Sequence, residues 1–110
     1  MTIVELNAFR WTEPEDFYSA LLAGLGAPDW HGRNINALVD SMIYGEINAI
    51  EQPLRVIIRG LEGANRQARE ELREVVDALV SEGACCRAGS DGTLIIEVLW
   101  PLSKGSLQSE

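Results

Sequence analysis

The sequence predicts an α/β domain in which a three-stranded parallel sheet packs against helices. Short runs rich in β-branched residues alternate with longer segments in which apolar residues recur every three or four positions. Glycine and proline separate these segments, as expected of turns. The predicted order is strand, helix, helix, strand, helix, strand. Because strands that alternate with helices are joined by right-handed crossovers, we expect the three strands to run parallel.

The length and composition are those of one folded domain. A chain of 110 residues with 46% hydrophobic residues is long enough to build a single core but too short for two. We place this domain at residues 1–102. The small, polar segment 103–110 is expected to form a flexible tail. We expect the free protein to be a monomer.

The first strand and the first helix have clear local signals. Residues 2–6 contain three aliphatic side chains and suit a strand. Thr12 is a candidate N-cap, and Pro14 fits the first turn of a helix. Gly24 and Gly26 are expected to end this helix. Its buried face is predicted from the large apolar residues at helical spacing: Phe17, Leu21, Leu22 and Leu25.

A second helix is predicted from about Arg33 to residue 42. Arg33, Asn36 and Asp40 are three and four residues apart, so they share one polar face of that helix. Its buried face is predicted from the apolar residues at helical spacing: Ile35, Leu38 and Met42.

The second half of the chain contains the remaining elements. The apolar run 54–60 lacks clean alternation, as in a central strand covered on both faces. Residues 65–81 form the longest helical pattern, which ends at Gly83. A turn at 89–92 leads into the third strand, 93–100, which Pro101 ends. The buried face of the last helix is predicted from six residues: Ala68, Leu72, Val75, Val76, Leu79 and Val80.

The charge of the chain restricts its partners. Seventeen acidic and nine basic residues give a formal charge of -8, which repels phosphates and disfavours nucleic acid as a direct ligand. Such a field attracts a basic protein, although many proteins are acidic for solubility alone. No apolar run approaches the ~18 residues of a membrane span. The N-terminus also lacks the features of a signal peptide.

The sequence shows no catalytic or metal-binding constellation. His31 is the only histidine, and no second motif supports a catalytic triad around it. Cys85 and Cys86 are adjacent, so a disulfide between them would be strained, and we expect a reducing compartment, the cytoplasm. In a strand they would point to opposite faces, which suits neither a zinc site nor a redox pair. We expect no cofactor. An alternative is a small hydrolase that uses Asp40 and His31.

The segment from the second loop into the second helix is better interpreted as a recognition surface. Trp30 offers a flat apolar area of the kind that anchors interfaces. Asp40 on a rigid helix can bind an arginine through two parallel hydrogen bonds, and Asn36 can donate and accept beside it. Gly32 and Asn34 are expected to shape the loop and the helix start. A purely structural interpretation, in which Trp30 covers the core, remains open.

This segment resembles the motif of the barstar family, intracellular inhibitors of secreted ribonucleases. In that family an aromatic pair and a glycine precede Asn-x-x-Ala-Leu-x-Asp on the second helix. Here Trp30-His31-Gly32 precedes Asn34-Ile-Asn-Ala-Leu-Val-Asp40. The predicted element order also matches the family's three-stranded parallel sheet with helices, so the resemblance extends to about Trp100. It implies an immunity protein or antitoxin that binds a basic nuclease and is not an enzyme.

In the barstar family, the second helix and its loop block the active site of the nuclease. By position, the resemblance implies that Asp40 is the acidic plug, that Trp30 is the aromatic contact and that Gly32 allows a close backbone approach. Tyr44 belongs to the segment after the helix, which also touches the enzyme. The complete set of implied contacts is Trp30, His31, Gly32, Arg33, Asn36, Val39, Asp40, Tyr44 and Asp77.

The sequence also departs from the family's pattern. Asn36 replaces an acidic residue, Val39 replaces an aromatic one, and an acidic position on the last helix falls at Ala78, with Asp77 beside it. Arg33 adds a positive charge. These differences indicate a target other than the family's best-known ribonuclease. A regulatory binding module that kept the fold without the inhibitory role is the other interpretation.

Overall fold

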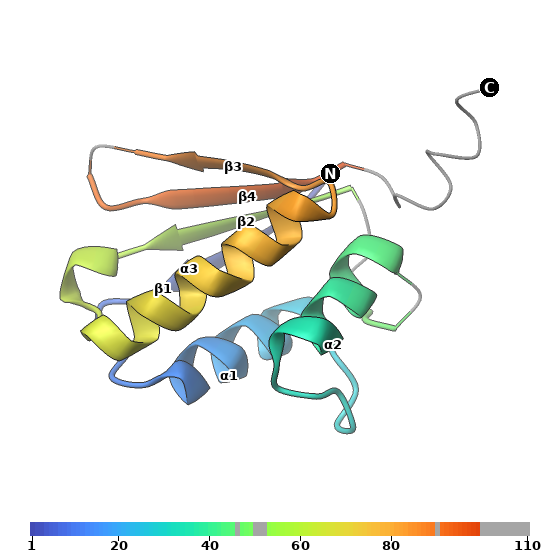
Figure 1. The fold of residues 1–110 in the computed structure, drawn as a ribbon, viewed down its shortest axis with the longest axis horizontal. Coiled ribbons are helices and arrows are strands. Elements are labelled where there is room, and N and C mark those ends of the chain that lie inside the picture. The colour runs from blue at the N-terminus through green and yellow to red at the C-terminus, as the bar shows by residue number, and fades with distance from the viewer. Residues whose placement is uncertain (46, 50–52, 90, 100–110) are drawn as a thin grey trace.

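The computed structural model describes residues 1–45, 47–49, 53–89 and 91–99. The predicted tail 103–110 and the predicted strand end at Pro101 lie outside these residues. Helices pack on one face of a sheet (Figure 1). The elements in chain order are β1 (Thr2–Asn7), α1 (Pro14–Leu25), α2 (Ile35–Val39), the π-helical turn η1 (Asp40–Tyr44), β2 (Leu54–Arg59), the 3-10 turn η2 (Leu61–Gly63), α3 (Arg66–Ser81), β3 (Cys85–Ala88) and β4 (Leu94–Val98).

The sheet confirms the α/β class but not the predicted topology. Four strands lie in the order β1-β2-β4-β3. β1 and β2 are parallel, whereas β4 is antiparallel to both β2 and β3. The prediction of three parallel strands is therefore wrong, because Cys85–Ala88 forms an additional strand and the last strand runs in the opposite direction. β3 still has the direction of β2, as expected after a crossover through α3.

A hairpin explains this difference. The backbone N–H of Gly89 donates to the carbonyl of Thr93 at 2.7 Å, and Gly92 adopts a positive φ of 82°. Glycine is favoured in this left-handed region because it lacks a Cβ. The chain therefore folds back after β3, and β4 inserts between β2 and β3.

The central strand β2 is covered on one face only. Leu54, Val56 and Ile58 are buried, whereas the alternate residues of β2 are partly or fully exposed. The expectation that both faces are covered is therefore wrong. On the open face Ile57 pairs with Ile95 of β4, and this cross-strand apolar pair interrupts the alternation in the sequence.

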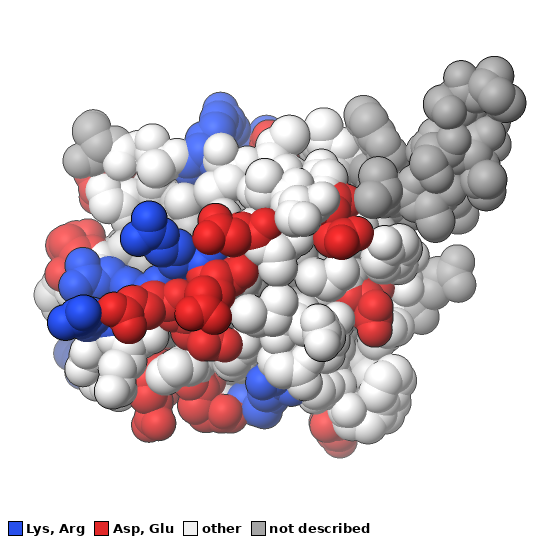
Figure 2. Space-filling model, in the orientation of Figure 1, with Lys and Arg blue, Asp and Glu red and all other residues white. Residues whose placement is uncertain are grey.

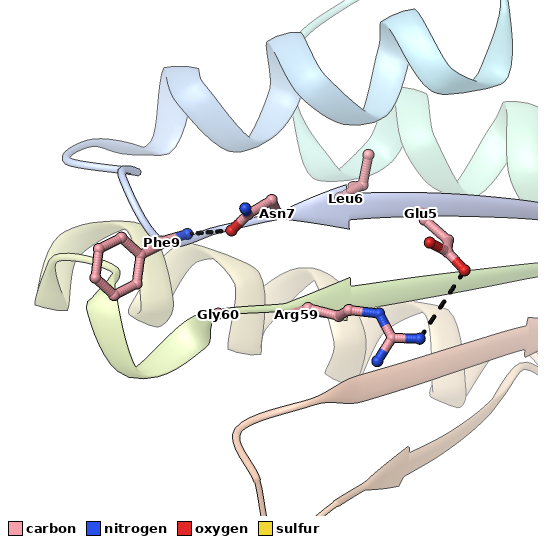
Figure 3. A pocket seen from close by; sticks show the side chains of 6 residues that line it. All are labelled: Glu5, Leu6, Asn7, Phe9, Arg59 and Gly60. Atoms are coloured by element: carbon pink, nitrogen blue, oxygen red, sulfur yellow. Dashed lines mark hydrogen bonds and ion pairs between the residues drawn. The ribbon is translucent and has the colours of Figure 1, made fainter.

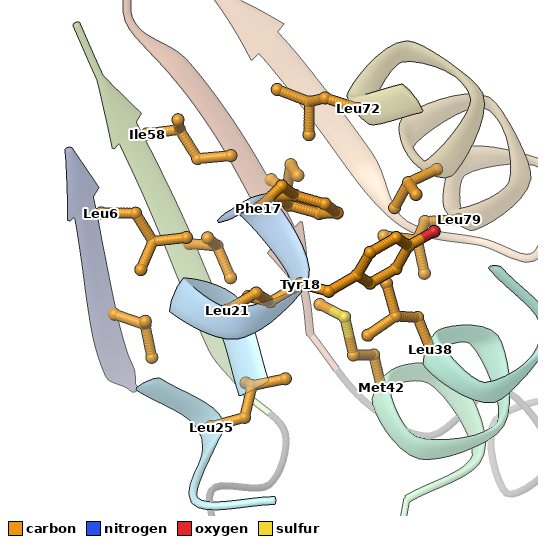
Figure 4. Packing of buried hydrophobic residues seen from close by; sticks show 14 of the residues in the cluster. Leu6, Phe17, Tyr18, Leu21, Leu25, Leu38, Met42, Ile58, Leu72 and Leu79 are labelled. Carbon is orange, nitrogen blue, oxygen red and sulfur yellow. The ribbon is translucent and has the colours of Figure 1, made fainter. Parts of the chain in front are cut away.

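The hydrophobic core lies between the sheet and the helices (Figure 4). The helices contribute Phe17, Tyr18, Leu21, Leu25, Leu38, Leu72 and Leu79, and η1 contributes Met42. The buried faces predicted from the periodicity of the three helices are therefore largely confirmed. Val80 is an exception and is exposed, because it lies about 100° around the helix from the buried Leu79.

The ends of α1 differ slightly from the prediction. Glu13, not Thr12, is the N-cap residue. Thr12 still stabilises the first turn, since its N–H and its hydroxyl both donate to the carboxylate of Asp16, at 2.8 and 3.1 Å. Gly24 lies within the helix, and Gly26 ends it in a left-handed conformation with φ 66°.

Candidate protein-binding surface

The start of α2 is defined by a side-chain cap. Asn34 adopts an extended conformation, and its side-chain oxygen accepts a hydrogen bond from the N–H of Ala37 at 2.9 Å. This confirms the structural role expected of Asn34 and places the helix start after Arg33. A Cβ on Gly32 would lie 3.0 Å from the Asn34 side chain and 3.2 Å from the Ala37 Cβ, so a small residue fits this position best.

The end of α2 is a π-helical turn that begins at Asp40. The N–H of Gly45 donates to the carbonyl of Asp40 at 3.2 Å, which is the i to i+5 bond of a π turn. Met42 and Ile43 in this turn are both buried, so the turn is packed against the core. The side of the segment that carries Asn36 and Asp40 is exposed. The Asp40 carboxylate therefore stands on a rigid support.

His31 occupies a different environment from the one expected of a contact residue. Its side chain is buried, with 7% exposure. Nδ1 lies 2.7 Å from the carbonyl oxygen of Gly32, and Nε2 lies 2.8 Å from Oγ of Ser41. Because a carbonyl can only accept, Nδ1 carries the proton, and the Ser41 hydroxyl donates to Nε2 in the neutral ring. His31 thus joins the loop to η1.

Arg33 is directed to α1 instead of the polar face of α2. Its guanidinium pairs with the carboxylate of Glu15 and donates to Oγ of Ser19 at 2.8 Å. Our prediction that Arg33 shares a helical face with Asn36 and Asp40 is therefore wrong, because the helix begins two residues later. Both partners of the ion pair are about half exposed, so its contribution to stability is small.

Aromatic side chains lie at both ends of this segment. Trp30 is 73% exposed, so it does not cover the core, and Tyr44 is also exposed. The Tyr44 hydroxyl donates to the carboxylate of Glu82 at 3.0 Å. This hydrogen bond, together with the charge of Glu82, raises the pKa of Tyr44. Val39 is partly buried and packs against the core, so only part of its side chain is available to a partner.

Two acidic residues from α3 and its C-cap contact the other helical segments. Glu71 of α3 accepts from the Tyr18 hydroxyl of α1, and Glu82, the residue after α3, accepts from the Tyr44 hydroxyl of η1. Asp77 lies about 120° around the helix from Glu71. Its charge contributes instead to the raised pKa of Cys86 in β3, which is due first to burial. Sequence reasoning missed Glu82, because only the tertiary packing shows which side of α3 faces η1.

Figure 2 shows how charge is distributed over the helical face of the molecule. Acidic side chains extend along α3 and toward α2. Basic side chains gather at the end of the molecule that carries the start of α3. Asp40, Tyr44 and Glu82 lie close together, because the Tyr44 hydroxyl bonds to Glu82 and the charge of Asp40 also contributes to the raised pKa of Tyr44.

The polar side chains of a separate hollow have partners within its own lining. This hollow of about 510 Å³ lies at the ends of β1 and β2 (Figure 3). Arg59 pairs with Glu5 at 3.9 Å, and the side chain of Asn7 accepts from the N–H of Phe9 at 3.0 Å.

Among the described residues no group of three or more His, Cys, Asp or Glu side chains could hold a metal ion. The helices in the described residues are too short or too polar to cross a lipid bilayer.

The fold is a small α/β domain in which the segment from the second loop into η1 carries an exposed tryptophan, Trp30, and an exposed carboxylate, Asp40. The family model described as Barstar (barnase inhibitor) matches residues 1–94. The chain therefore belongs to the barstar family, which confirms the resemblance noted in the motif around Trp30 and Asp40. Barstar-family proteins are inhibitors, not enzymes. No match was found among curated proteins or among solved structures.

Proposed function

We propose that this protein is an inhibitor or immunity protein that binds a basic nuclease, in the first instance a ribonuclease. In this proposal, the loop and helix at 28–44 block the active site of the nuclease. The observation that carries the proposal is the hydrogen bond between His31 and Ser41. It holds the residue after Trp30 against the residue after Asp40, which supports a single preorganised surface that includes the exposed indole and the exposed carboxylate.

Electrostatics support a basic target. The active site of a nuclease binds phosphates, and a carboxylate such as that of Asp40 can occupy the position of a phosphate on an arginine. The Glu82 carboxylate, held beside Tyr44, adds a second negative charge at the end of η1. A net charge of -8 would also accelerate association with a basic protein.

The contact residues are revised by their environments. Trp30, Asn36, Asp40 and Tyr44 are exposed and are proposed as direct contacts. Glu82 is added to them. His31 and Arg33 are proposed to position the loop, Gly32 to allow its close approach to α2, and Val39 to contribute an apolar edge. Asp77 is proposed to lie outside the contact.

The hydrolase alternative has less support from the geometry. Both ring nitrogens of His31 are bonded, to Gly32 and to Ser41, and neither is bonded to Asp40. Ser41 itself is 2% exposed.

The non-inhibitory regulatory module remains the second candidate. We also propose that residues 1–102 act as one monomeric domain. A location in the cytoplasm is supported by Cys85 and Cys86, which are both free thiols.

Inhibition assays test this function directly. A panel of basic ribonucleases that includes barnase is assayed for RNA cleavage with the parent protein, with Asp40→Ala and with the matched control Glu62→Ala. Glu62 is an exposed acidic residue in η2, remote in the fold from α2. We expect inhibition by the parent and by Glu62→Ala but much weaker inhibition by Asp40→Ala. Binding without inhibition would favour the regulatory module, and equal inhibition by all three proteins would contradict the proposed surface.

A further inference from the structure

An apolar groove lies along the N-terminal and middle turns of α3, away from the C-terminal end that contacts η1. It has a volume of about 220 Å³ and is lined by aliphatic side chains from η2, α3 and β4: Leu61, Leu72, Val76 and Leu94. Arg69 and Arg73 of α3 complete its wall. This groove is distinct from the protein-binding surface, because η2 and α2 lie at opposite ends of the molecule (Figure 1).

Within the described residues, the two arginines of the groove lack acidic partners. Among the described residues, Arg66 pairs with Glu70 at 2.8 Å, whereas Arg69 and Arg73 form no ion pair. Both side chains are exposed. They are four positions apart on one helix and therefore neighbours on its surface, so their like charges repel each other. Basic side chains gather at this end of the molecule, next to acidic ones, whereas most of the other charged side chains on this face are acidic (Figure 2). An anionic occupant would relieve this repulsion.

The size of the groove indicates the kind of occupant. A volume of about 220 Å³ is below the range of roughly 300–1,000 Å³ that is typical of small-molecule and cofactor sites. It suits one large apolar side chain inserted as an anchor. Arginine binds carboxylates through a planar pair of donors, so Arg69 and Arg73 suit acidic residues that flank such an anchor.

We propose that this groove binds an acidic peptide segment of a second partner protein. One large apolar side chain of that segment occupies the groove, and its neighbouring carboxylates bind Arg69 and Arg73. The basic nuclease proposed for the other surface would be repelled here, because the charges have the same sign.

The charges of the two surfaces are well separated. Arg73 of α3 and Glu82, the residue after the end of α3, are nine positions apart in sequence, which corresponds to about 13 Å along the helix axis. This separation exceeds the Debye length of roughly 8 Å at physiological ionic strength, so the two charged regions act independently. The peptide site and the nuclease site can therefore be tested separately.

A peptide selection tests the proposal with random sequences in place of the partner. A phage library of random dodecapeptides is selected on the full chain after subtraction on the double variant Arg69→Glu/Arg73→Glu. Subtraction removes basic peptides that bind the acidic side of the molecule, since the variant retains that side. We expect enriched peptides to share one large apolar residue flanked by aspartate or glutamate.

Calorimetry with an enriched synthetic peptide then locates the site. Each exposed ion pair contributes up to about fivefold in affinity, so the double variant should bind about tenfold or more weakly. Arg73→Gln should bind more weakly than the parent but more tightly than the double variant. Arg66→Gln is the matched control, since Arg66 is on the same helix but pairs with Glu70, and it should bind as the parent does. Melting curves verify that each variant is folded.

Several outcomes would overturn the proposal. They are a selection without enrichment, enrichment of neutral or basic peptides, and equal affinity of the parent and the double variant. A parent protein that dimerises in sedimentation equilibrium, when Arg69→Glu/Arg73→Glu does not, would identify a second copy as the occupant instead. Binding to anionic phosphatidylglycerol vesicles without any peptide binding would identify a lipid surface.

Discussion

Nε2 of His31 lies 2.8 Å from Oγ of Ser41, and this hydrogen bond joins the loop before α2 to the π turn after it. Both side chains are buried. The bond spans ten positions of sequence and closes the segment 31–41 into one unit, in which Asp40 is exposed and which the exposed Trp30 precedes. A preorganised segment loses less conformational entropy when it binds a partner.

This bond predicts a specific tautomer of His31. The neutral ring should carry its proton on Nδ1, because Nδ1 donates to the Gly32 carbonyl. The nitrogen chemical shifts of the imidazole, measured by NMR, report this directly. A proton on Nε2 of the neutral ring would contradict the geometry. Ser41→Ala should destabilise the fold by about 1–3 kcal/mol, since it leaves Nε2 buried without a partner.

Asp40→Ala should separate binding from stability. Its side chain is exposed, so its removal should change the free energy of unfolding by at most ~0.5 kcal/mol. Binding to the target nuclease should weaken by ~2–5 kcal/mol, as expected when one member of a buried charge pair is removed. Asn36→Ala should cost less, about 0.5–1.5 kcal/mol, because it loses a neutral hydrogen bond. Calorimetry measures binding, and melting curves measure stability.

Leu38→Ala should show the opposite pattern. Leu38 is fully buried between α2 and the core (Figure 4), so its truncation leaves a cavity and should cost roughly 2–5 kcal/mol of stability. Binding per folded molecule should change little at a temperature where the variant remains folded. If Leu38→Ala weakened binding as much as Asp40→Ala without destabilising the protein, the assignment of the two faces of α2 would be reversed.

Tyr18 should make the fold sensitive to alkaline pH. Its hydroxyl donates to the carboxylate of Glu71, and burial, followed by this bond, raises the pKa of Tyr18 well above its usual value. The folded state then retains a proton that the unfolded state releases above pH ~10, so stability is full below that pH and decreases above it. Denaturant melts from pH 8 to 11 measure this slope. Tyr18→Phe should have a smaller slope, and an identical slope would refute the assignment.

The two cysteines should differ in reactivity. Cys85 is exposed, whereas burial and the charge of Asp77 raise the pKa of the Cys86 thiol. Iodoacetamide should therefore label Cys85 before Cys86, because the thiolate is the reactive form. Replacing both by Ser should leave partner binding unchanged in reducing and in oxidising buffer. A large difference between the two buffers for the parent would reveal a redox role.

Local sequence patterns predicted the three helices and most of their buried residues, although not all of their ends. Apolar residues at helical spacing predicted the buried faces of α1 and α3, because this periodicity follows from the geometry of a single helix. The motif from Trp30 to Asp40 predicted the family, and Asn34 predicted the helix cap. Each of these features depends on residues that are close together in the chain.

Only the tertiary structure decided how distant segments meet. The pairing of β4 between β2 and β3 depends on hydrogen bonds between strands, and a run of apolar residues does not specify their direction. The burial of His31 against Ser41, the bond from Arg33 to α1 and the bond from Tyr44 to Glu82 likewise depend on how the helices pack. Side-chain roles of this kind are set by long-range contacts, which the spacing of residues along one segment does not encode.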